Sequence, residues 1–304
     1  MRTWALAISI LAAVATPALA QGLPVGTTRF EIADTDQFPG LPVRGQIGAV
    51  GTPMPVFVHR PPAWTPADRI LIVMHGTNRD ADRYMAEWTG QAERGNVLVV
   101  VPEFSQAKFP RRENYNFGSV VLADFTVRPR EDWTFDVIDR VFAAVKARSG
   151  ATRDTYVFYG HSAGAQFVHR YLLLASASKA EMIVSANSGS YTMPTAEVAF
   201  PFGLGGVPVG RDDLARAFAR PVVILLGDQD IDPNHSSLPR DPPAMAQGPH
   251  RLARGHAFFM AAQAAAKRLE VPFNWRLIEV PGVGHSNGGM ADAALRAMAG
   301  GVAR

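Results

Sequence analysis

Short runs of apolar residues alternate with amphipathic segments from about residue 69 to residue 300. Continuous apolar runs are typical of strands that are buried on both faces of a parallel sheet. Together with two earlier candidates, they predict strands at 28–32, 54–59, 70–74, 97–101, 156–159, 181–186, 221–226 and 273–280. The segments between them have apolar residues at helical spacing and predict helices at 81–94, 131–148, 163–177, 251–269 and 290–299. This alternation indicates an α/β fold with a doubly wound, mostly parallel sheet and helices on both faces.

Three long connections interrupt the alternation. Residues 102–130 carry several aromatic side chains among polar ones, and connections of this length are usually functional or mobile. Residues 191–215 combine glycines with Met-Pro and Phe-Pro pairs, which predicts an irregular insertion that covers a pocket at the carboxyl side of a strand. Residues 231–248 are rich in proline and predict a third loop.

The first 20 residues have the layout of a secretory signal. Arg2 precedes an apolar stretch at 4–14, and Ala18-Leu19-Ala20 forms an A-x-A cleavage site. A membrane-spanning helix is the alternative, but polar residues and a proline interrupt the stretch, which is shorter than the roughly 20 residues that a span needs. We therefore expect a cleaved signal peptide at 1–20, one domain at 21–304, and a periplasmic or secreted protein.

The composition fits a single globular domain. Hydrophobic residues make up 47% of the 304 residues, which is enough to build the core of one α/β domain. The formal charge of +3 is close to neutral for this length, so nucleic-acid binding has no support. The sequence has no cysteine, so an exported form would depend on its core alone for stability.

One motif joins an expected strand to an expected helix. Gly160-His161-Ser162-Ala163-Gly164 matches G-x-S-x-G, the nucleophile elbow, whose glycines let the strand and the helix pack closely around a strained serine. A glycine-rich turn with an incidental serine is the alternative, but the motif requires a strand-turn-helix setting and has one here. We expect Ser162 to project into solvent at the edge of the sheet.

Polar residues follow several of the expected strands. In an open parallel sheet, ligands bind outside the carboxyl ends of the strands, so these residues are candidates for one common site. They are His75-Gly76-Thr77, Ser162, Asn187-Ser188, the three aspartates Asp228, Asp230 and Asp232, and His285.

A serine nucleophile needs two further groups from this set. A neutral imidazole must take the hydroxyl proton, and a carboxylate must hold that imidazole in the right tautomer. Ser162, an aspartate near position 230 and His285 occur in the order Ser, Asp, His, which is the order typical of the elbow motif. We favour Asp230 because it stands a few residues beyond the strand, and Asp232 and Asp228 remain alternatives.

The reaction also needs donors for the oxygen of a tetrahedral intermediate. The backbone N–H of Ala163, directly after the nucleophile, is expected to be one, and that of Thr77 in the loop after the strand at 70–74 the other. No H-E-x-x-H or comparable spacing predicts a metal site, and no cofactor is expected. Three aromatic residues are expected to form the wall of the acyl pocket: Trp133, Tyr191 and Phe202.

These motifs together resemble the α/β-hydrolases of serine esterase type, and within them the secreted polyhydroxybutyrate depolymerase and feruloyl esterase branch. The resemblance covers roughly residues 54 to 300 and rests on the His75-Gly76 loop, the elbow, Gly227-x-x-Asp230 and Gly284-His285. It implies that Thr77, which follows His-Gly, donates to the oxyanion and that Asp230 is the acid. Depolymerases of this branch commonly carry disulfides and a separate substrate-binding domain, and this chain departs from them in both respects.

The expected function is therefore an exported serine hydrolase that cleaves carboxylic esters, small or polymeric, through an acyl-serine intermediate. A peptidase or amidase with the same triad is one alternative, and a haloperoxidase or a lyase that reuses the triad is another. A non-catalytic binding protein on the same fold is the alternative from a different class, because fold does not determine function.

Overall fold

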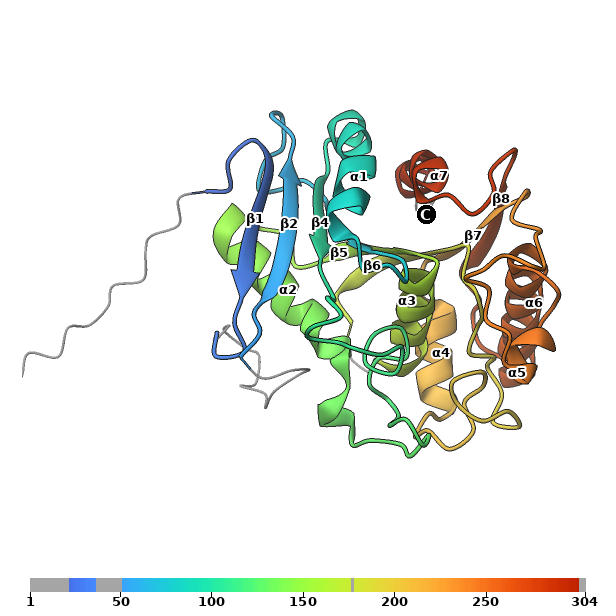
Figure 1. Cartoon of the computed structure of the whole chain (residues 1–304). Coiled ribbons are helices and arrows are strands. Elements are labelled where there is room, and N and C mark those ends of the chain that lie inside the picture. The colour runs from blue at the N-terminus through green and yellow to red at the C-terminus, as the bar shows by residue number, and fades with distance from the viewer. Residues whose placement is uncertain (1–21, 37–50, 176–177, 301–304) are drawn as a thin grey trace, which may run out of the picture.

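The computed structural model describes residues 22–36, 51–175 and 178–300, so the expected signal peptide at 1–20 lies outside the described residues. Eight strands form one sheet in the order β1-β2-β4-β3-β5-β6-β7-β8 (Figure 1). The pairs β1–β2 and β2–β4 are antiparallel, and all the others are parallel. The strands are β1 (Gly26–Ile32), β2 (Met54–Arg60), β3 (Ile70–Met74), β4 (Leu98–Pro102), β5 (Tyr156–His161), β6 (Ala180–Ala186), β7 (Val222–Gly227) and β8 (Trp275–Val280).

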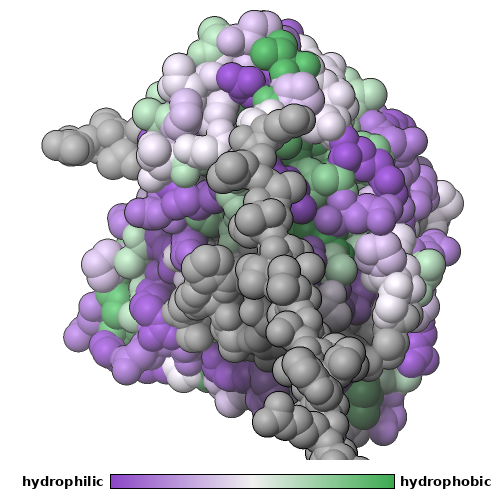
Figure 2. Space-filling view, turned by 90° about the vertical axis from the view of Figure 1, so that its left-hand side faces the viewer, coloured by the Kyte–Doolittle hydropathy of each residue, from purple (hydrophilic) through white to green (hydrophobic). Residues whose placement is uncertain are grey.

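The central strands are buried on both faces, as their apolar runs predict. In β3, Ile70 and Ile72 face one core and Leu71 and Val73 face the other, because successive side chains of a strand point to opposite faces. At the edge of the sheet, β1 alternates exposed residues with half-buried ones, so one of its faces meets water. The view onto this side in Figure 2 is mostly hydrophilic, with separate small apolar patches among the residues that are coloured.

Helices cover both faces of the sheet. One layer, formed by α1 and α7, lies above the sheet in Figure 1, and α2, α3, α4 and α6 lie below it. Within the described ranges, none of the helices combines the length and the apolar character that a bilayer span requires. The helices are α1 (Ala81–Gly95), α2 (Val137–Ser149), α3 (Ala163–Leu174), α4 (Arg211–Ala219), α5 (Pro242–Met245), α6 (Arg251–Leu269) and α7 (Asn287–Ala299), and two 3-10 turns precede α2 at Arg130–Asp132 and Thr134–Asp136.

The helix expected at 131–148 begins later than the sequence pattern indicates. Its first turns are 3-10 and are separated by Trp133, whose backbone is extended. The indole N–H of Trp133 donates to the carbonyl of Arg128 at 3.0 Å, and the N–H of Thr134 donates to the carbonyl of Gly118 at 2.8 Å. These contacts attach the segment to the preceding loop, so the regular helix starts only at Val137.

The irregular insertion expected at 191–215 ends earlier than predicted, because helix α4 begins at Arg211. Gly210 precedes this helix, and its N–H donates to the carboxylate of Asp213 at 2.8 Å, which satisfies a backbone donor before the first turn. The other differences are smaller. Helix α3 ends at Leu174 instead of near 177, β8 starts two residues later than expected, and α7 starts three residues earlier.

Candidate active site

Ser162 stands in a strained turn between β5 and α3. Its φ of 58° and ψ of −117° lie outside the conformations that residues with a side chain normally adopt, and such strain is usually found at functional positions. The N–H of Ser162 donates to the carbonyl of Ala186 in β6 at 3.1 Å, which connects the turn to the neighbouring strand. Ser162 is 8% exposed, so the expectation that it projects into open solvent is wrong. Its side chain instead lies at the wall of two cavities, which are described below.

The two glycines of the elbow are required for space. A Cβ atom on Gly164 would overlap the carbonyl oxygen of Met74 at the end of β3, and one on Gly160 would overlap the backbone of Gly164. Helix α3 therefore passes directly against the ends of β3 and β5. This close approach explains both glycines by packing, independently of any resemblance.

Three loops at the carboxyl edge of the sheet bring three side chains into line. The Nε2 atom of His285, after β8, lies 3.0 Å from the Oγ atom of Ser162, after β5. The Nδ1 atom of the same ring lies 2.7 Å from an Oδ2 oxygen of Asp230, after β7. When Nδ1–H donates to the carboxylate, Nε2 is left free to accept the serine proton.

Of the three aspartates that the sequence leaves open, Asp230 is the one that contacts His285. Its carboxylate is buried, with 3% of the residue exposed. Asp228 instead accepts the N–H of Gly282 at 2.7 Å, and the exposed Asp232 accepts the N–H of Asn234 at 2.8 Å. Asp228 thus connects the end of β7 to the turn after β8, and Asp232 stabilises the turn in which it lies.

Asp230 has a second partner that the sequence did not indicate. The guanidinium of Arg251, the first residue of α6, donates to the other carboxylate oxygen at 3.3 Å. It also donates to the hydroxyl of Ser237 at 2.9 Å. Arg251 is fully buried, so both members of this ion pair are removed from solvent. The arginine thus orients the carboxylate that orients the histidine.

Asn187 connects the segment that carries Asp230, which we call the acid loop, to the segment that carries His285, the histidine loop. Its side-chain N–H donates to the carbonyl of Gly284 at 3.0 Å, and its side-chain oxygen accepts the N–H of Gly227 at 2.8 Å. The residue is 1% exposed and has a positive φ of 48°, which asparagine tolerates better than most residues. The sequence placed Asn187 at a strand end but indicated no role for it.

The surroundings of His285 favour its neutral form. Burial lowers its pKa below the ordinary value, the hydrogen bond and the charge of Asp230 oppose that effect, and the nearby Arg251 and His235 lower the pKa further. The ring of His161 lies 4.7 Å from that of His285. Burial holds the pKa of His161 well below its usual range, so it adds no positive charge near neutral pH. A neutral His285 is the form that can act as a base.

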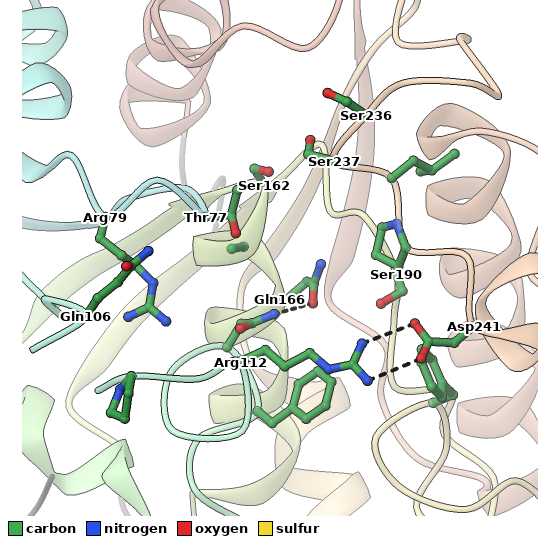
Figure 3. Close-up of a pocket in the computed structure, with 17 residues that line it drawn as sticks. Thr77, Arg79, Gln106, Arg112, Ser162, Gln166, Ser190, Ser236, Ser237 and Asp241 are labelled. Atoms are coloured by element: carbon green, nitrogen blue, oxygen red, sulfur yellow. Dashed lines mark hydrogen bonds and ion pairs between the residues drawn. The ribbon is translucent and has the colours of Figure 1, made fainter. Parts of the chain in front are cut away.

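Two backbone N–H groups beside Ser162 are available to a ligand. Ala163 opens α3, so its N–H has no partner within the helix, and Thr77 lies in the loop between β3 and α1. Within the described part of the chain, neither N–H group donates a hydrogen bond. Gly76 lets this loop pack closely against Tyr84 of α1, since a Cβ atom there would lie 2.8 Å from the hydroxyl oxygen of Tyr84. Figure 3 shows Thr77 next to Ser162.

Two cavities meet at Ser162. The first, which we call the arginine cavity, has a volume of about 310 Å³. It is lined by Thr77, Arg79, Gln106, Pro110, Arg112, Asn116, Phe117, Ser162, Ala163, Gln166, Ser190, Phe202, Ser236, Ser237, Leu238, Pro239 and Asp241 (Figure 3). The second, the histidine cavity, has about 360 Å³ and is lined by Gly76, Thr77, Asn78, Asp80, Arg83, Tyr84, His161, Ser162, His235, Ser236, Ser237, His285, Ser286 and Asn287.

Of the three expected aromatic wall residues, Phe202 lines the arginine cavity, and Trp133 and Tyr191 line neither cavity. Both are buried in the core, where aromatic partners hold them. Tyr191 stacks on Phe258 of α6 with ring centroids 4.5 Å apart, and Trp133 meets Phe135 edge to face at 6.2 Å. The sequence therefore did not distinguish aromatic side chains of the core from one that lines the cavity.

Comparison with known proteins places this site in a family. No protein-family model matches the chain, and no curated protein sequence matches it. Among solved structures, it is similar to poly(aspartic acid) hydrolase-1 from Sphingomonas sp. KT-1, with 38% identity over 90% of this chain and 98% of that one, and a TM-score of 0.82. It is also similar to LpqC, a poly(3-hydroxybutyrate) depolymerase from Bordetella parapertussis, with 36% identity over 90% and 88% of the two chains and a TM-score of 0.81.

The chain belongs to the depolymerase-type α/β-hydrolases. The expected fold and the expected family resemblance are both confirmed. The siderophore hydrolase EstA from Aspergillus nidulans, at 14% identity and a TM-score of 0.54, shares the fold alone. This α/β-hydrolase is thus an enzyme that hydrolyses ester or related bonds.

Several cavity residues of this hydrolase were missed by the sequence analysis. Most come from the long connections at 102–130 and 231–248, which the sequence marked as functional or loop-forming without indicating which side chains matter. Gln166 comes from α3, one turn after Ser162, and the sequence pattern indicated no role for it. Among the described residues, no group of His, Cys, Asp and Glu side chains is arranged to hold a metal ion.

Proposed function

We propose that the protein is an exported serine hydrolase that cleaves carboxylic esters through an acyl-serine intermediate. The observation that carries this proposal is the hydrogen-bonded line of Ser162, His285 and Asp230, with contacts of 3.0 Å and 2.7 Å. Beside it lie two N–H groups that donate to none of the described residues. A nucleophile, a base and an orienting acid at these distances are the arrangement that acyl transfer requires.

In the first half of the reaction, Ser162 Oγ attacks the acyl carbon while His285 Nε2 takes the hydroxyl proton. The carbonyl oxygen becomes an oxyanion, which the N–H groups of Ala163 and Thr77 would hold. Losing one such donor typically costs about 10² to 10³ in rate, so these two groups account for a large part of the expected catalysis. Asp230 stabilises the imidazolium that forms and keeps Nε2 directed at the serine.

His285 then returns the proton to the leaving alkoxide, which departs as an alcohol. In the second half, a water molecule loses a proton to His285 and attacks the acyl-serine carbon, and Ser162 is regenerated with release of a carboxylic acid. No oxidation state changes in either half, so no electron acceptor is required, and His285 carries every proton that moves.

The two cavities suggest how a substrate would lie. Because His285 lines the histidine cavity and must reach the leaving oxygen, the alcohol part belongs on that side. The arginine cavity, which contains Ala163 but not His285, is then the acyl side. A substrate that fills both extends well beyond the scissile bond in both directions, which favours an oligomer or polymer. Similarity to a poly(3-hydroxybutyrate) depolymerase supports the same proposal.

Amide hydrolysis is the second candidate. The observation that favours it is the 38% identity to a poly(aspartic acid) hydrolase, whose named substrate is a polyamide. The same groups would act, with an amine as the leaving group. Export is proposed from the signal-like residues 1–20 alone, and secretion of the full-length chain with cleavage after Ala20 would support it.

The test is hydrolysis of p-nitrophenyl esters from acetate to palmitate by residues 21–304, with Ser162→Ala as the inactive variant. Ser149→Ala, at the end of α2 where the hydroxyl accepts the N–H of Ala151, is the matched control. We expect Ser162→Ala to lower kcat by at least about 10³-fold. A fluorophosphonate should label Ser162, as detected by mass spectrometry of the peptide. Equal rates in both variants, or activity on peptides with none on esters, would refute the esterase proposal.

A further inference from the structure

The charges on the wall of the arginine cavity are unevenly paired. Arg112 donates to both carboxylate oxygens of Asp241, at 3.2 Å and 3.3 Å (Figure 3). Its Nε also donates to Glu113 at 3.3 Å. This guanidinium is therefore neutralised within the protein. Arg79 faces the same cavity, and no carboxylate of the described residues forms an ion pair with it.

Neutral groups hold the guanidinium of Arg79 in place. It donates to the carbonyl of Phe104 at 2.5 Å and to that of Arg111 at 3.4 Å, and it lies over the ring of Tyr115, 4.2 Å from the ring centroid. Burial lowers the pKa of Arg79, but the ordinary pKa of arginine is so high that the side chain stays charged near neutral pH. A cation that is fixed and partly desolvated but not paired is a site where an anion gains most from binding.

A second cation, which forms no ion pair with the described residues, lies behind the floor of the cavity. Arg170 of α3 is fully buried, and its hydrogen bonds go to neutral groups, among them the carbonyl of Asn116 at 2.8 Å and the hydroxyl of Thr192 at 2.9 Å. Burial and the charge of Arg112 lower its pKa to about 9, so it remains positive near neutral pH. Its charge adds to that of Arg79 in the cavity.

The floor also presents a donor. The side-chain oxygen of Gln166 accepts the amide of Asn116 at 2.8 Å and is 3.4 Å from a guanidinium nitrogen of Arg170. Both partners are donors, so the oxygen of Gln166 is committed and its NH₂ group is the end that remains for a ligand. In Figure 3 that nitrogen points upward, toward the side of the cavity where Ser162 lies.

We propose that the arginine cavity selects an acyl group that carries a carboxylate, and that Arg79 is the residue that recognises it. The substrate class is esters, or the corresponding amides, whose acyl part is acidic: half esters of dicarboxylic acids, or oligomers with a carboxylate on the acyl side of the scissile bond. This inference rests on the proposed function, because it takes the acyl group to lie in the cavity that contains Ala163 but not His285.

The experiment compares charged and neutral acyl groups of equal length. Mono-p-nitrophenyl glutarate, adipate and suberate are each paired with the p-nitrophenyl methyl diester of the same acid. We expect kcat/KM for at least one charged substrate to exceed that for its neutral partner about tenfold or more at low salt, and the ratio to fall in 0.5 M NaCl. Arg79→Gln should bring the ratio near one. Arg79→Lys should keep part of it, because a lysine retains the charge but not the planar donors.

Arg111→Gln is the control, since it removes the same charge from an exposed neighbour outside the cavity. The proposal is overturned if the ratio of kcat/KM between charged and neutral substrates is near one in the wild type, or if it is equal in the wild type and Arg79→Gln. In either case, turnover of the neutral esters would still support the proposed function. If no ester is hydrolysed, the proposed function fails, and calorimetric titration of Ser162→Ala with adipate decides the binding site. The proposed role of Arg79 is supported if Ser162→Ala binds adipate and the Ser162→Ala, Arg79→Gln double variant does not. It is overturned if Ser162→Ala does not bind adipate, or if both variants bind it equally.

Discussion

Replacing the buried carboxylate of Asp230 by the amide in Asp230→Asn tests the assembly of the site most directly. The carboxylate has two partners, His285 on one oxygen and Arg251 on the other. An asparagine can donate from its NH₂ group to Nδ1 of His285, which moves the ring proton to Nε2 and points it at the nucleophile. The imidazole is then in the wrong tautomer to accept the hydroxyl proton of Ser162.

The size of the effect follows from these two contacts. Loss of the correct tautomer lowers kcat by about 10⁴-fold in a triad of this kind. The change also leaves Arg251 buried without a negative partner, and breaking a buried ion pair from one side costs about 3–5 kcal/mol of folding free energy. For a chain of this size, each kcal/mol lowers the melting temperature by about 2 °C, so we expect a decrease of roughly 6–10 °C.

The assay measures kcat for a short p-nitrophenyl ester and the melting temperature of each variant. Asp232→Asn and Asp228→Asn are matched controls, because both carboxylates contact backbone N–H groups instead of His285. We expect them to keep kcat within about threefold of the wild type. Adding Arg251→Met to Asp230→Asn should restore part of the melting temperature and none of the activity. A kcat above a tenth of the wild-type value in Asp230→Asn, or a loss confined to Asp232→Asn, would refute the reasoning.

Three further predictions concern pH and the loop connection. Because the pKa of His285 is lowered, kcat/KM for a neutral ester should rise with pH to a plateau and reach half its maximum below pH 6.5, and a midpoint at or above 6.5 would contradict this. Burial lowers the pKa of His75 to about 4, so between pH 6.5 and 4 the unfolded chain binds a proton that the folded chain does not. The free energy of unfolding, measured by urea denaturation, should therefore fall as the pH drops from 6.5 toward 4. Asn187→Ala removes two buried hydrogen bonds, which connect Asn187 to Gly227 and to Gly284. We expect it to lower the free energy of unfolding by about 2–4 kcal/mol in the same assay and to lower kcat about tenfold or more. A lower stability with unchanged kcat would show that the connection does not position the histidine.

Much of the fold was predictable because its strands are buried on both faces. Runs such as Ile70–Met74 are apolar throughout, and a parallel sheet between two helical layers is the architecture that suits such runs. The start of α2 was not predictable, because side-chain and backbone bonds to a distant loop hold Trp133 and Thr134 in another conformation. Local propensity had no information about that loop.

The candidate site divides in the same way. Ser162 and His285 could be proposed from a motif and from their order along the chain, because an elbow imposes its own geometry and strand ends meet at one edge. Among three aspartates within five residues, the sequence favoured Asp230 without excluding Asp232 or Asp228, because spacing does not determine which carboxylate turns toward the histidine. The partnership of Asp230 with Arg251 became visible only when α6 was placed beside the acid loop.

By itself, then, the sequence determined the alternation of strands and helices, the turn that strains Ser162 and the strand ends from which a base and an acid could come. These properties depend on residues close together in the chain. The tertiary structure alone decided which aspartate contacts His285, the burial of Ser162 and the charge of the cavity beside it. Those depend on contacts between loops far apart in sequence, such as Arg79 with Phe104 and Arg112 with Asp241, which packing of the whole sheet brings together.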